Sequence, residues 1–256
     1  MPNHYVIGDV HGEYQTLLAL IAQLPRDAKL IFVGDLIDRG AQSQEVVAFI
    51  RENNHQTVMG NHEGLFCKFA LEFLSHLDGE IAYAEINQRW HKSGRFETFL
   101  SYGVVAISKE GRYRVVNDPR SKERLRDDIA WMRQNPLYLV VDRGDSSDKK
   151  VVVSHSNISQ VWHIRNDQKR KLDFQQTTLW TRDHTVDKGA KIFNIFGHHP
   201  QKFKPEITED YVNVDTGCCY GSIEDDLYGR LSAYCVETGE ILMQKKYTGK
   251  NDEQKK

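Results

Sequence analysis

The sequence predicts an α/β fold in one large domain, and three observations support this prediction. Five short apolar runs rich in β-branched residues each end in a small residue followed by a polar side chain. The first three runs are separated by amphipathic segments, residues 13–24 and 43–53, as expected for βαβ units with parallel strands. A chain of 256 residues can bury a full core, with or without an inserted segment.

Each apolar run is expected to be a buried strand, in the order HYVIGD, KLIFVGD, HQTVMGN, KVVVSH and IFNIFGH. Continuous apolar runs suit strands that are covered on both faces. In open α/β sheets, ligands gather beyond the carboxyl ends of the strands. The polar residues that end the runs are therefore expected to converge on one edge of the sheet: Asp9, Asp35, Asn61, His155 and His198.

The composition is that of an ordinary globular protein, with 39% hydrophobic and 27% charged residues and a net charge of −2. This charge does not favour nucleic-acid or membrane binding. The sequence has neither a long apolar span nor a secretory leader pattern, so a cytoplasmic location is expected. Its cysteines form no C-x-x-C pair and are expected to be small buried side chains in a reducing compartment: Cys67, Cys218, Cys219 and Cys235.

The polar residues that end the runs are potential metal ligands. Asp9 and His11 are two residues apart, so in extended backbone both side chains point the same way. Together with the later residues they make two carboxylates, one amide and three imidazoles, a set that suits manganese, iron or zinc. Six ligands exceed the needs of one ion, whereas two ions bridged by a carboxylate would use them all. Taken singly, each motif also fits a turn, a helix cap or a hydrogen-bonded core histidine.

Three motifs carry a family resemblance: GDVHG at 8–12, GDLIDRG at 34–40 and GNHE at 60–63. They resemble, in order and spacing, the signature blocks of the phosphoprotein-phosphatase family of binuclear metallophosphatases. The later SHSN and FGHHP resemble its two C-terminal histidine blocks. Within the family, the chain is most similar to small bacterial and phage serine/threonine protein phosphatases. The resemblance implies a calcineurin-like β-sandwich flanked by helices over residues 1–248. It leaves out residues 76–137, where the sequence itself predicts a mainly helical insertion, and residues 249–256 are expected to be a polar tail.

The resemblance also implies a role for each site residue. Two divalent ions, manganese or alternatively iron or zinc, would activate a bridging water for in-line attack on phosphorus. The implied ligands are Asp9 and His11 for the first ion, Asp35 as the bridge, and Asn61, His155 and His198 for the second. The implied catalytic residues are His62 as general acid, Asp38 as its partner, and Arg39 and Arg182 as phosphoryl-binding groups.

The chain departs from the family pattern at two places. Ser156 and Asn157 stand where the family commonly has alanine and glycine. The doublet His198-His199 replaces the usual histidine-threonine, so the choice of metal ligand between these two histidines stays open.

Two enzyme activities and one non-enzymatic role fit the sequence. A serine/threonine protein phosphatase, with phosphotyrosine as a further substrate, is favoured by Asp38 and Glu63. A symmetrical diadenosine tetraphosphatase or another nucleotide pyrophosphohydrolase is the alternative, because DTGCCYG at 215–221 is similar to its C-terminal block. A phosphate-binding or scaffold protein would need an incomplete ligand set, and this set is complete. The expected partner is therefore a phosphorylated protein or a small phosphoester; the oligomeric state is left open.

The segment 76–137 has two helix-like stretches, near 79–102 and 122–134, around an arginine-rich sequence. It is interpreted either as a solvated helical face or as a cap over the metal site. In the second interpretation, the side chains that contact the substrate are Trp90, His91, Arg95 and Arg112.

Overall fold

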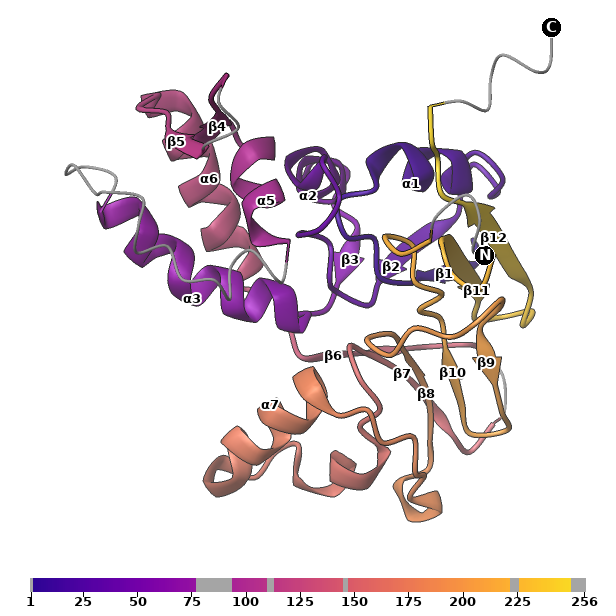
Figure 1. Cartoon of the computed structure of the whole chain (residues 1–256). Helices are drawn as coiled ribbons and strands as arrows, with labels where there is room; N and C mark the ends of the chain where they lie inside the picture. Colours follow the sequence, from indigo (N-terminus) through magenta and orange to yellow (C-terminus); the bar gives the residue numbers. More distant parts are fainter. Residues whose placement is uncertain (1, 77–93, 110–112, 145–146, 222–225, 250–256) are drawn as a thin grey trace, which may run out of the picture.

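Two five-stranded mixed sheets form the centre of the protein (Figure 1). The computed structural model describes residues 2–76, 94–109, 113–144, 147–221 and 226–249. The first sheet, in the order β12-β11-β1-β2-β3, contains β1 (His4–Ile7), β2 (Lys29–Phe32), β3 (Gln56–Thr57), β11 (Arg230–Cys235) and β12 (Ile241–Lys245). The second, in the order β6-β7-β8-β10-β9, contains β6 (Tyr138–Val141), β7 (Lys150–Ser154), β8 (Ile192–Phe196), β9 (Glu206–Ile207) and β10 (Tyr211–Asn213).

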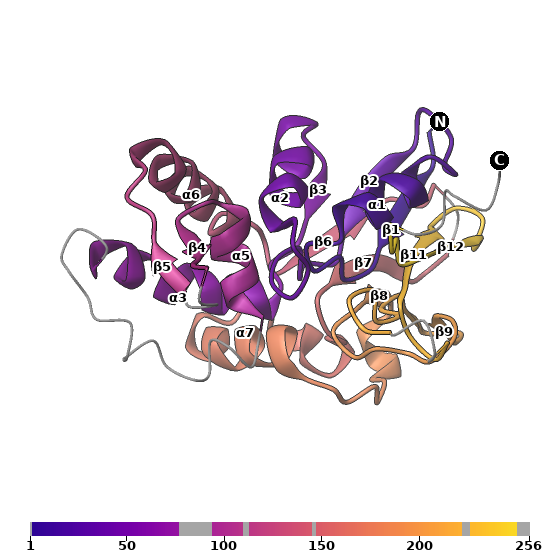
Figure 2. The same ribbon diagram turned by 45° about the horizontal axis from the view of Figure 1, so that its top comes forward.

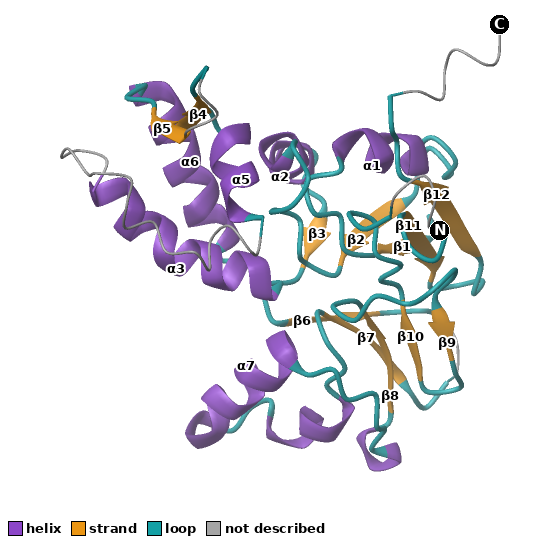
Figure 3. Ribbon diagram, in the orientation of Figure 1, coloured by secondary structure: helices purple, strands orange, loops and turns teal. Residues whose placement is uncertain are grey.

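Helices cover the outer faces of the two sheets (Figures 1 and 3). The first sheet is covered by α1 (Tyr14–Ile21) and α2 (Ser43–Glu52), and the second by α7 (Lys171–Trp180) and the 3₁₀ helix η2 (Ser159–Ile164). A second group of helices lies to one side of the sheets (Figure 2). It consists of α3 (Asn61–His76), α5 (Arg95–Ser101) and α6 (Pro119–Met132).

The strand sequences are apolar throughout because both faces of each sheet are covered. In β1, Tyr5 and Ile7 pack among the helices, whereas Val6 packs in the core between the two sheets. In β7, Val152 faces outward, toward the core formed with α7 and η2. Successive strand residues point to opposite faces, so a strand with a covered face on each side has no exposed position. The protein is therefore a four-layer sandwich, helix on sheet on sheet on helix.

The expectation of one sheet edge, drawn from the strand pattern alone, is wrong. The parallel pairs are present, since β1 pairs with β2, β2 with β3, and β7 with β8. However, the first three strands lie in one sheet and the last two in the other. Each sheet is covered on its inner face by the other sheet rather than by helices. The β-sandwich implied by the family resemblance is thus confirmed.

The segment 76–137 is helical as expected, with additions. Residues 79–93 of the first expected helix fall in the part that the structure does not describe, and α5 begins only at Arg95. The second helix, α6, starts earlier than expected because Asp118 caps it by accepting a hydrogen bond from the Ser121 amide at 3.0 Å. Between the helices, the strands β4 (Val105–Ile107) and β5 (Tyr113–Val115) form an antiparallel pair that the sequence analysis missed.

The cysteines are all free thiols. Cys67, Cys218 and Cys235 are buried, as expected for small apolar side chains, and Cys219 is half-buried. Among the described residues, no helix has the length and apolar character needed to cross a membrane.

Candidate active site

A pocket of about 210 Å³ opens where the carboxyl ends of strands from both sheets meet. Eight of the ten predicted site residues line it, and the remaining two, Asp38 and His155, lie directly behind this lining. The lining side chains are Asp9, His11, Asp35, Arg39, Asn61, His62, Trp180, Arg182, His198, Pro200 and Tyr220. Residues that are far apart in the sequence are therefore brought together at the seam between the sheets.

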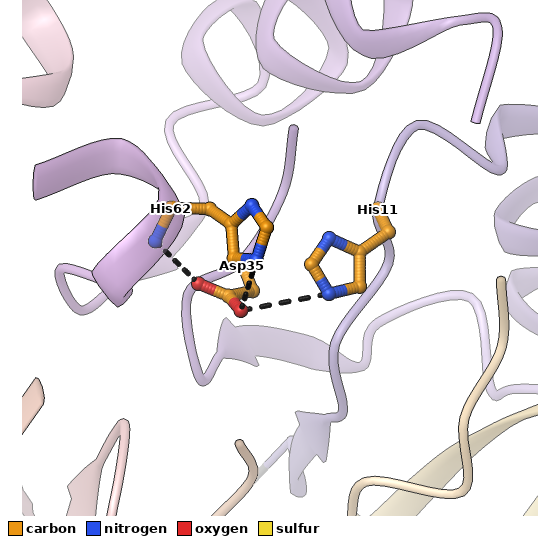
Figure 4. Close-up of side chains that lie close together, drawn as sticks. All are labelled: His11, Asp35 and His62. Carbon is orange, nitrogen blue, oxygen red and sulfur yellow. Dashed lines mark hydrogen bonds and ion pairs between the residues drawn. The ribbon is translucent and has the colours of Figure 1, made fainter. Parts of the chain in front are cut away.

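Asp35 lies at the centre of the site. Its Oδ2 is 3.5 Å from His11 Nε2 and 3.9 Å from His62 Nε2 (Figure 4). Its Oδ1 is 3.5 Å from His155 Nε2. Two groups of potential ligands share this carboxylate, with the ligand atoms of each group within 4.8 Å of one another. One group adds His11 and His62, and the other adds His155 and His198. This is the arrangement expected for two adjoining cation sites with one bridging ligand.

Two of the histidines have their ring protons fixed by backbone carbonyls. His11 Nδ1 lies 2.8 Å from the Ile37 oxygen, and His155 Nδ1 lies 2.8 Å from the Val33 oxygen. A carbonyl can only accept, so each Nδ1 carries the proton. Burial lowers the pKa of both rings, which keeps them neutral and leaves a lone pair on each Nε2.

Those lone pairs face the carboxylate oxygens of Asp35, which are also acceptors. Two acceptors at 3.5 Å repel each other unless a cation lies between them. Neutral imidazoles that donate their other N–H to a carbonyl are the form in which histidine binds metals. The donor set therefore fits divalent transition-metal ions.

Asn61 lies beside the second group. Its side-chain Oδ1 is 2.8 Å from His155 Nε2 and 3.1 Å from His198 Nδ1. With the amide reversed, its nitrogen would donate to both rings; with the oxygen facing them, it supplies a further ligand atom. Burial lowers the pKa of His198 to about 3, so this ring is neutral. His199 instead places its Nδ1 3.3 Å from His184 Nε2. The structure thus turns His198, rather than His199, toward the group.

Asp9 lines the pocket but lies outside both ligand groups. Its carboxylate accepts the backbone amide of His198 at 3.2 Å. Burial raises its pKa well above the usual value, and the nearby Asp215 and Asp35 carboxylates raise it further. A buried cluster of carboxylates is stabilised in its ionised form by a cation. The assignment of Asp9 as a metal ligand remains a prediction.

Asp215 is a buried carboxyl of the site that the sequence analysis missed. Burial raises its pKa to about 7. It follows β10 in the sequence YVNVDTG, which has the same form as the five expected strands, an apolar run ended by a polar residue. Counting this segment as a sixth apolar run would have identified Asp215 from the sequence.

His62 and Asp38 form a close pair at the first turn of α3. The distance from His62 Nδ1 to Asp38 Oδ2 is 2.6 Å, and the His62 amide donates to Asp35 Oδ1 at 3.0 Å. Burial alone would lower the pKa of His62, but the Asp35 and Asp38 carboxylates outweigh it and raise that pKa. Because Nδ1 is held by Asp38, Nε2 is the atom that can exchange a proton with a molecule in the pocket.

The two predicted arginines both line the pocket. Arg39 places Nη1 2.8 Å from His11 Nε2 and Nη2 3.2 Å from His62 Nε2. Its guanidinium lies 4.9 Å from the centre of the Tyr220 ring. Arg182 comes just after α7 and lines the same pocket. A planar guanidinium can hold two oxygens of a phosphoryl group at once, which suits both residues for oxyanion binding.

The backbone of the site is unusual. Five non-glycine site residues have left-handed φ angles: His11 (48°), Asp35 (51°), Asp38 (72°), Arg39 (72°) and His198 (69°). Such conformations are uncommon outside glycine and concentrate at functional sites, where the surrounding structure enforces them. Here the turns are tied to each other, since the amides of Val10 and His11 both donate to the Asp35 oxygen.

Glu63 holds two of these turns together and is completely buried. Its Oε2 accepts the amides of Asp35 at 2.8 Å and Gly60 at 3.0 Å. Its Oε1 accepts those of Leu36 at 2.8 Å and Ile37 at 3.3 Å. Burial raises the pKa of Glu63 to about 7, as does the neighbouring Asp35 carboxylate. Glu63 therefore fixes the loop that carries Asp35 without itself lining the pocket.

Glu63→Gln is expected to lower the free energy of unfolding by about 1–3 kcal/mol. The reason is that the glutamine NH₂ group, itself a donor, would replace an oxygen that accepts two backbone N–H groups. Urea denaturation with matched protein concentrations would measure this. Glu123→Gln on the exposed side of α6 is the control and should leave the midpoint unchanged. Equal midpoints for both variants would show that the four backbone contacts add nothing to stability.

Residues 4–227 match the sequence profile of the calcineurin-like phosphoesterases. The chain belongs to this family. It is also similar to curated relatives with different activities. It is 26% identical over 242 residues to an asymmetrical bis(5'-nucleosyl)-tetraphosphatase from Anoxybacillus flavithermus, covering 84% of this chain and 86% of the relative. It is 26% identical over 232 residues to serine/threonine-protein phosphatase 2 from Salmonella typhimurium, covering 86% and 89%. It is 27% identical over 210 residues to a symmetrical bis(5'-nucleosyl)-tetraphosphatase from Proteus mirabilis, covering 80% and 60%.

Solved structures agree on the fold. A protein serine/threonine phosphatase from Saccharomyces cerevisiae superposes with a TM-score of 0.58 at 14% identity, covering 96% of this chain and 81% of the other. A metallophosphoesterase from Sphaerobacter thermophilus gives a TM-score of 0.50 at 13% identity, covering 95% and 87%. This calcineurin-like phosphoesterase is therefore a metal-dependent phosphoester hydrolase with the fold of its family.

Proposed function

We propose that this phosphoesterase is a serine/threonine protein phosphatase. The observation that carries the proposal is the His62–Asp38 pair, with its 2.6 Å contact and with a His62 ring that lines the pocket beside the Arg39 guanidinium. Hydrolysis of a phosphoserine or phosphothreonine releases an alkoxide, which leaves poorly unless it receives a proton in the transition state. Cleavage of a nucleoside polyphosphate releases a phosphate anion, which leaves readily without one. A positioned proton donor is thus of most use to a phosphatase that acts on alkyl monoesters.

The residues with the right donors to hold two divalent ions are Asp9, His11, Asp35, Asn61, His155 and His198. Such ions, manganese or alternatively iron or zinc, supply an activated water and stabilise charge on the phosphoryl group.

The chain's own side chains account for the remaining parts of the reaction. Arg39 and Arg182 bind phosphoryl oxygens and orient the phosphorus toward the Asp35 side of the pocket. His62 Nε2 gives its proton to the departing oxygen, and Asp38 holds the ring and stabilises its positive charge before transfer. The burial of these groups strengthens each electrostatic contact, because water screens them less.

A dinucleoside tetraphosphate hydrolase is the second candidate. It is favoured by the similarity to the two tetraphosphatases and by two aromatic side chains at the pocket. Trp180 and Tyr220 both line the pocket and are each 40% exposed, so part of each aromatic side chain is available for contact with a nucleobase. Tyr220 belongs to the DTGCCYG segment, in which the sequence resembles that branch of the family.

A substrate panel with the manganese-loaded protein separates the two candidates. We expect kcat/KM for phosphothreonine and phosphoserine peptides to exceed that for diadenosine tetraphosphate, with p-nitrophenyl phosphate as the reference for a good leaving group. A protein prepared with chelator and no added metal is the control for metal dependence. A preference for the tetraphosphate over every phosphopeptide would reject the protein phosphatase and support the second candidate.

A further inference from the structure

Helix α5 belongs to the inserted segment, yet it reaches the interior of the active site. Thr98 on this helix is fully buried. Its hydroxyl donates to Asp38 Oδ1 at 2.7 Å and accepts the Asp38 amide at 3.0 Å. We infer that Thr98 is a positioning residue for the proton donor and acts on His62 through Asp38. The inference rests on the role of His62 in the proposed function.

The contacts of Asp38 show how this positioning works. Its two carboxylate oxygens are divided, with Oδ2 bound to His62 Nδ1 and Oδ1 bound to Thr98. A carboxylate held at one oxygen can rotate about its last bond, whereas one held at both has a fixed plane. The plane of the carboxylate in turn sets the direction in which the imidazole presents Nε2. Ser43 supports the same network, since its Oγ accepts the Asp38 amide at 3.1 Å.

The start of α5 also holds the residue after Asp38. The Arg39 amide donates to the Gly94 oxygen at 2.8 Å. These two backbone segments approach so closely that a Cβ atom added at Gly94 would lie 2.7 Å from Arg39 Cα. Because Asp38 and Arg39 both have left-handed φ angles, this contact helps to keep the turn in a conformation that it would not adopt alone.

Arg95 corrects one expectation drawn from the sequence. In the cap interpretation, one of the two drawn from the sequence, it contacts the substrate, but it is buried, with its Nε 3.7 Å from Asp38 Oδ2, and it does not line the pocket. The other three residues of that set, Trp90, His91 and Arg112, lie outside the described residues. The described part of the insertion thus meets the site from behind, at the acid pair.

Thr98→Val tests the inference because valine has nearly the same shape and lacks the hydroxyl. We expect kcat for a phosphothreonine peptide to fall about 10- to 100-fold, with the Michaelis constant little changed. The loss with p-nitrophenyl phosphate should be much smaller, because that leaving group scarcely needs a proton. Thr98→Ser keeps the hydroxyl and should restore most of the activity toward the peptide.

The matched control is Ser101→Ala on the same helix. Ser101 Oγ accepts the Gln44 amide at 2.6 Å, so its loss perturbs α5 without touching Asp38. We expect this variant to change kcat for the phosphothreonine peptide and for p-nitrophenyl phosphate by the same factor. If Thr98→Val proves unfolded by circular dichroism, Thr98→Ala provides the same comparison.

A second measurement does not depend on turnover. Proton NMR at one fixed pH should show the His62 Nδ1–H, bonded to Asp38, as a strongly downfield signal in the native protein, and this signal should move upfield or broaden in Thr98→Val. An unchanged ratio of peptide to p-nitrophenyl phosphate activity, together with an unchanged ring spectrum, would overturn the inference. Failure of the proposed function would give a different result. The ring spectrum would still respond to Thr98→Val, but His62→Asn would lower kcat for the peptide and for p-nitrophenyl phosphate by the same factor.

Discussion

Asp35→Asn is expected to lower turnover by about 10²- to 10⁴-fold and to reduce the bound metal to at most one ion per chain. The reason is that each oxygen of Asp35 faces a different ligand group, with His11 and His62 on one side and His155 on the other. An amide has one oxygen and no charge, so it cannot serve two cations. Losing metal stabilisation of several kcal/mol corresponds to a rate loss of this size.

Elemental analysis and steady-state kinetics on the same preparation would measure both effects. Asparagine has nearly the same shape as aspartate, so the fold should be retained, which circular dichroism can confirm. Asp173→Asn, at an exposed position of α7, is the control for the loss of one carboxylate. Two ions per chain and full activity in Asp35→Asn would show that this carboxylate does not bridge.

His62→Asn should lower kcat for a phosphothreonine peptide by about 10²- to 10⁴-fold, the usual contribution of a proton donor. The Michaelis constant should change little, because a proton donor acts in the transition state. With p-nitrophenyl phosphate the loss should be smaller. The dependence on the leaving group is thus the signature of an acid, and a series of alkyl and aryl phosphates would measure it.

The same variant decides between two roles that the geometry allows for His62. Its ring lies in one ligand group with His11 and Asp35, yet its Nδ1 is bound to Asp38. If it is the acid, His62→Asn keeps both ions. If it is a metal ligand, elemental analysis will show a loss of metal, and kcat will fall by the same factor for substrates with poor and with good leaving groups. His163→Asn, at an exposed position of η2, controls for the removal of a histidine.

The sequence was sufficient to predict most of the pocket because each of its ligands follows an apolar strand. The carboxyl ends of strands meet in space, so a local pattern carried information on a distant contact. Asp215 was missed only because its strand was overlooked, and the pattern would have found it. The identity of the ligands that meet in the pocket was therefore encoded locally.

Other features could not be predicted from a local pattern. Glu63 accepts three of its four backbone amides from residues 26 to 28 positions away, and Thr98 acts on a carboxylate 60 positions away. Neither role depends on a recognisable spacing, since any chain path that brings the groups together would serve. The division of the strands into two sheets is also non-local, because an apolar face is satisfied equally by a helix or by another sheet.

The left-handed turns of the pocket have a consequence for redesign of this protein. Glycine adopts these φ angles without the steric cost of about 1–2 kcal/mol that other residues bear. A procedure that optimises thermal stability alone would therefore select glycine at positions such as Asp38, Arg39 and His198. Each choice would delete a group assigned to chemistry. Activity and heat resistance compete at the same backbone positions here, so gains in heat resistance should be sought elsewhere, in the outer helices.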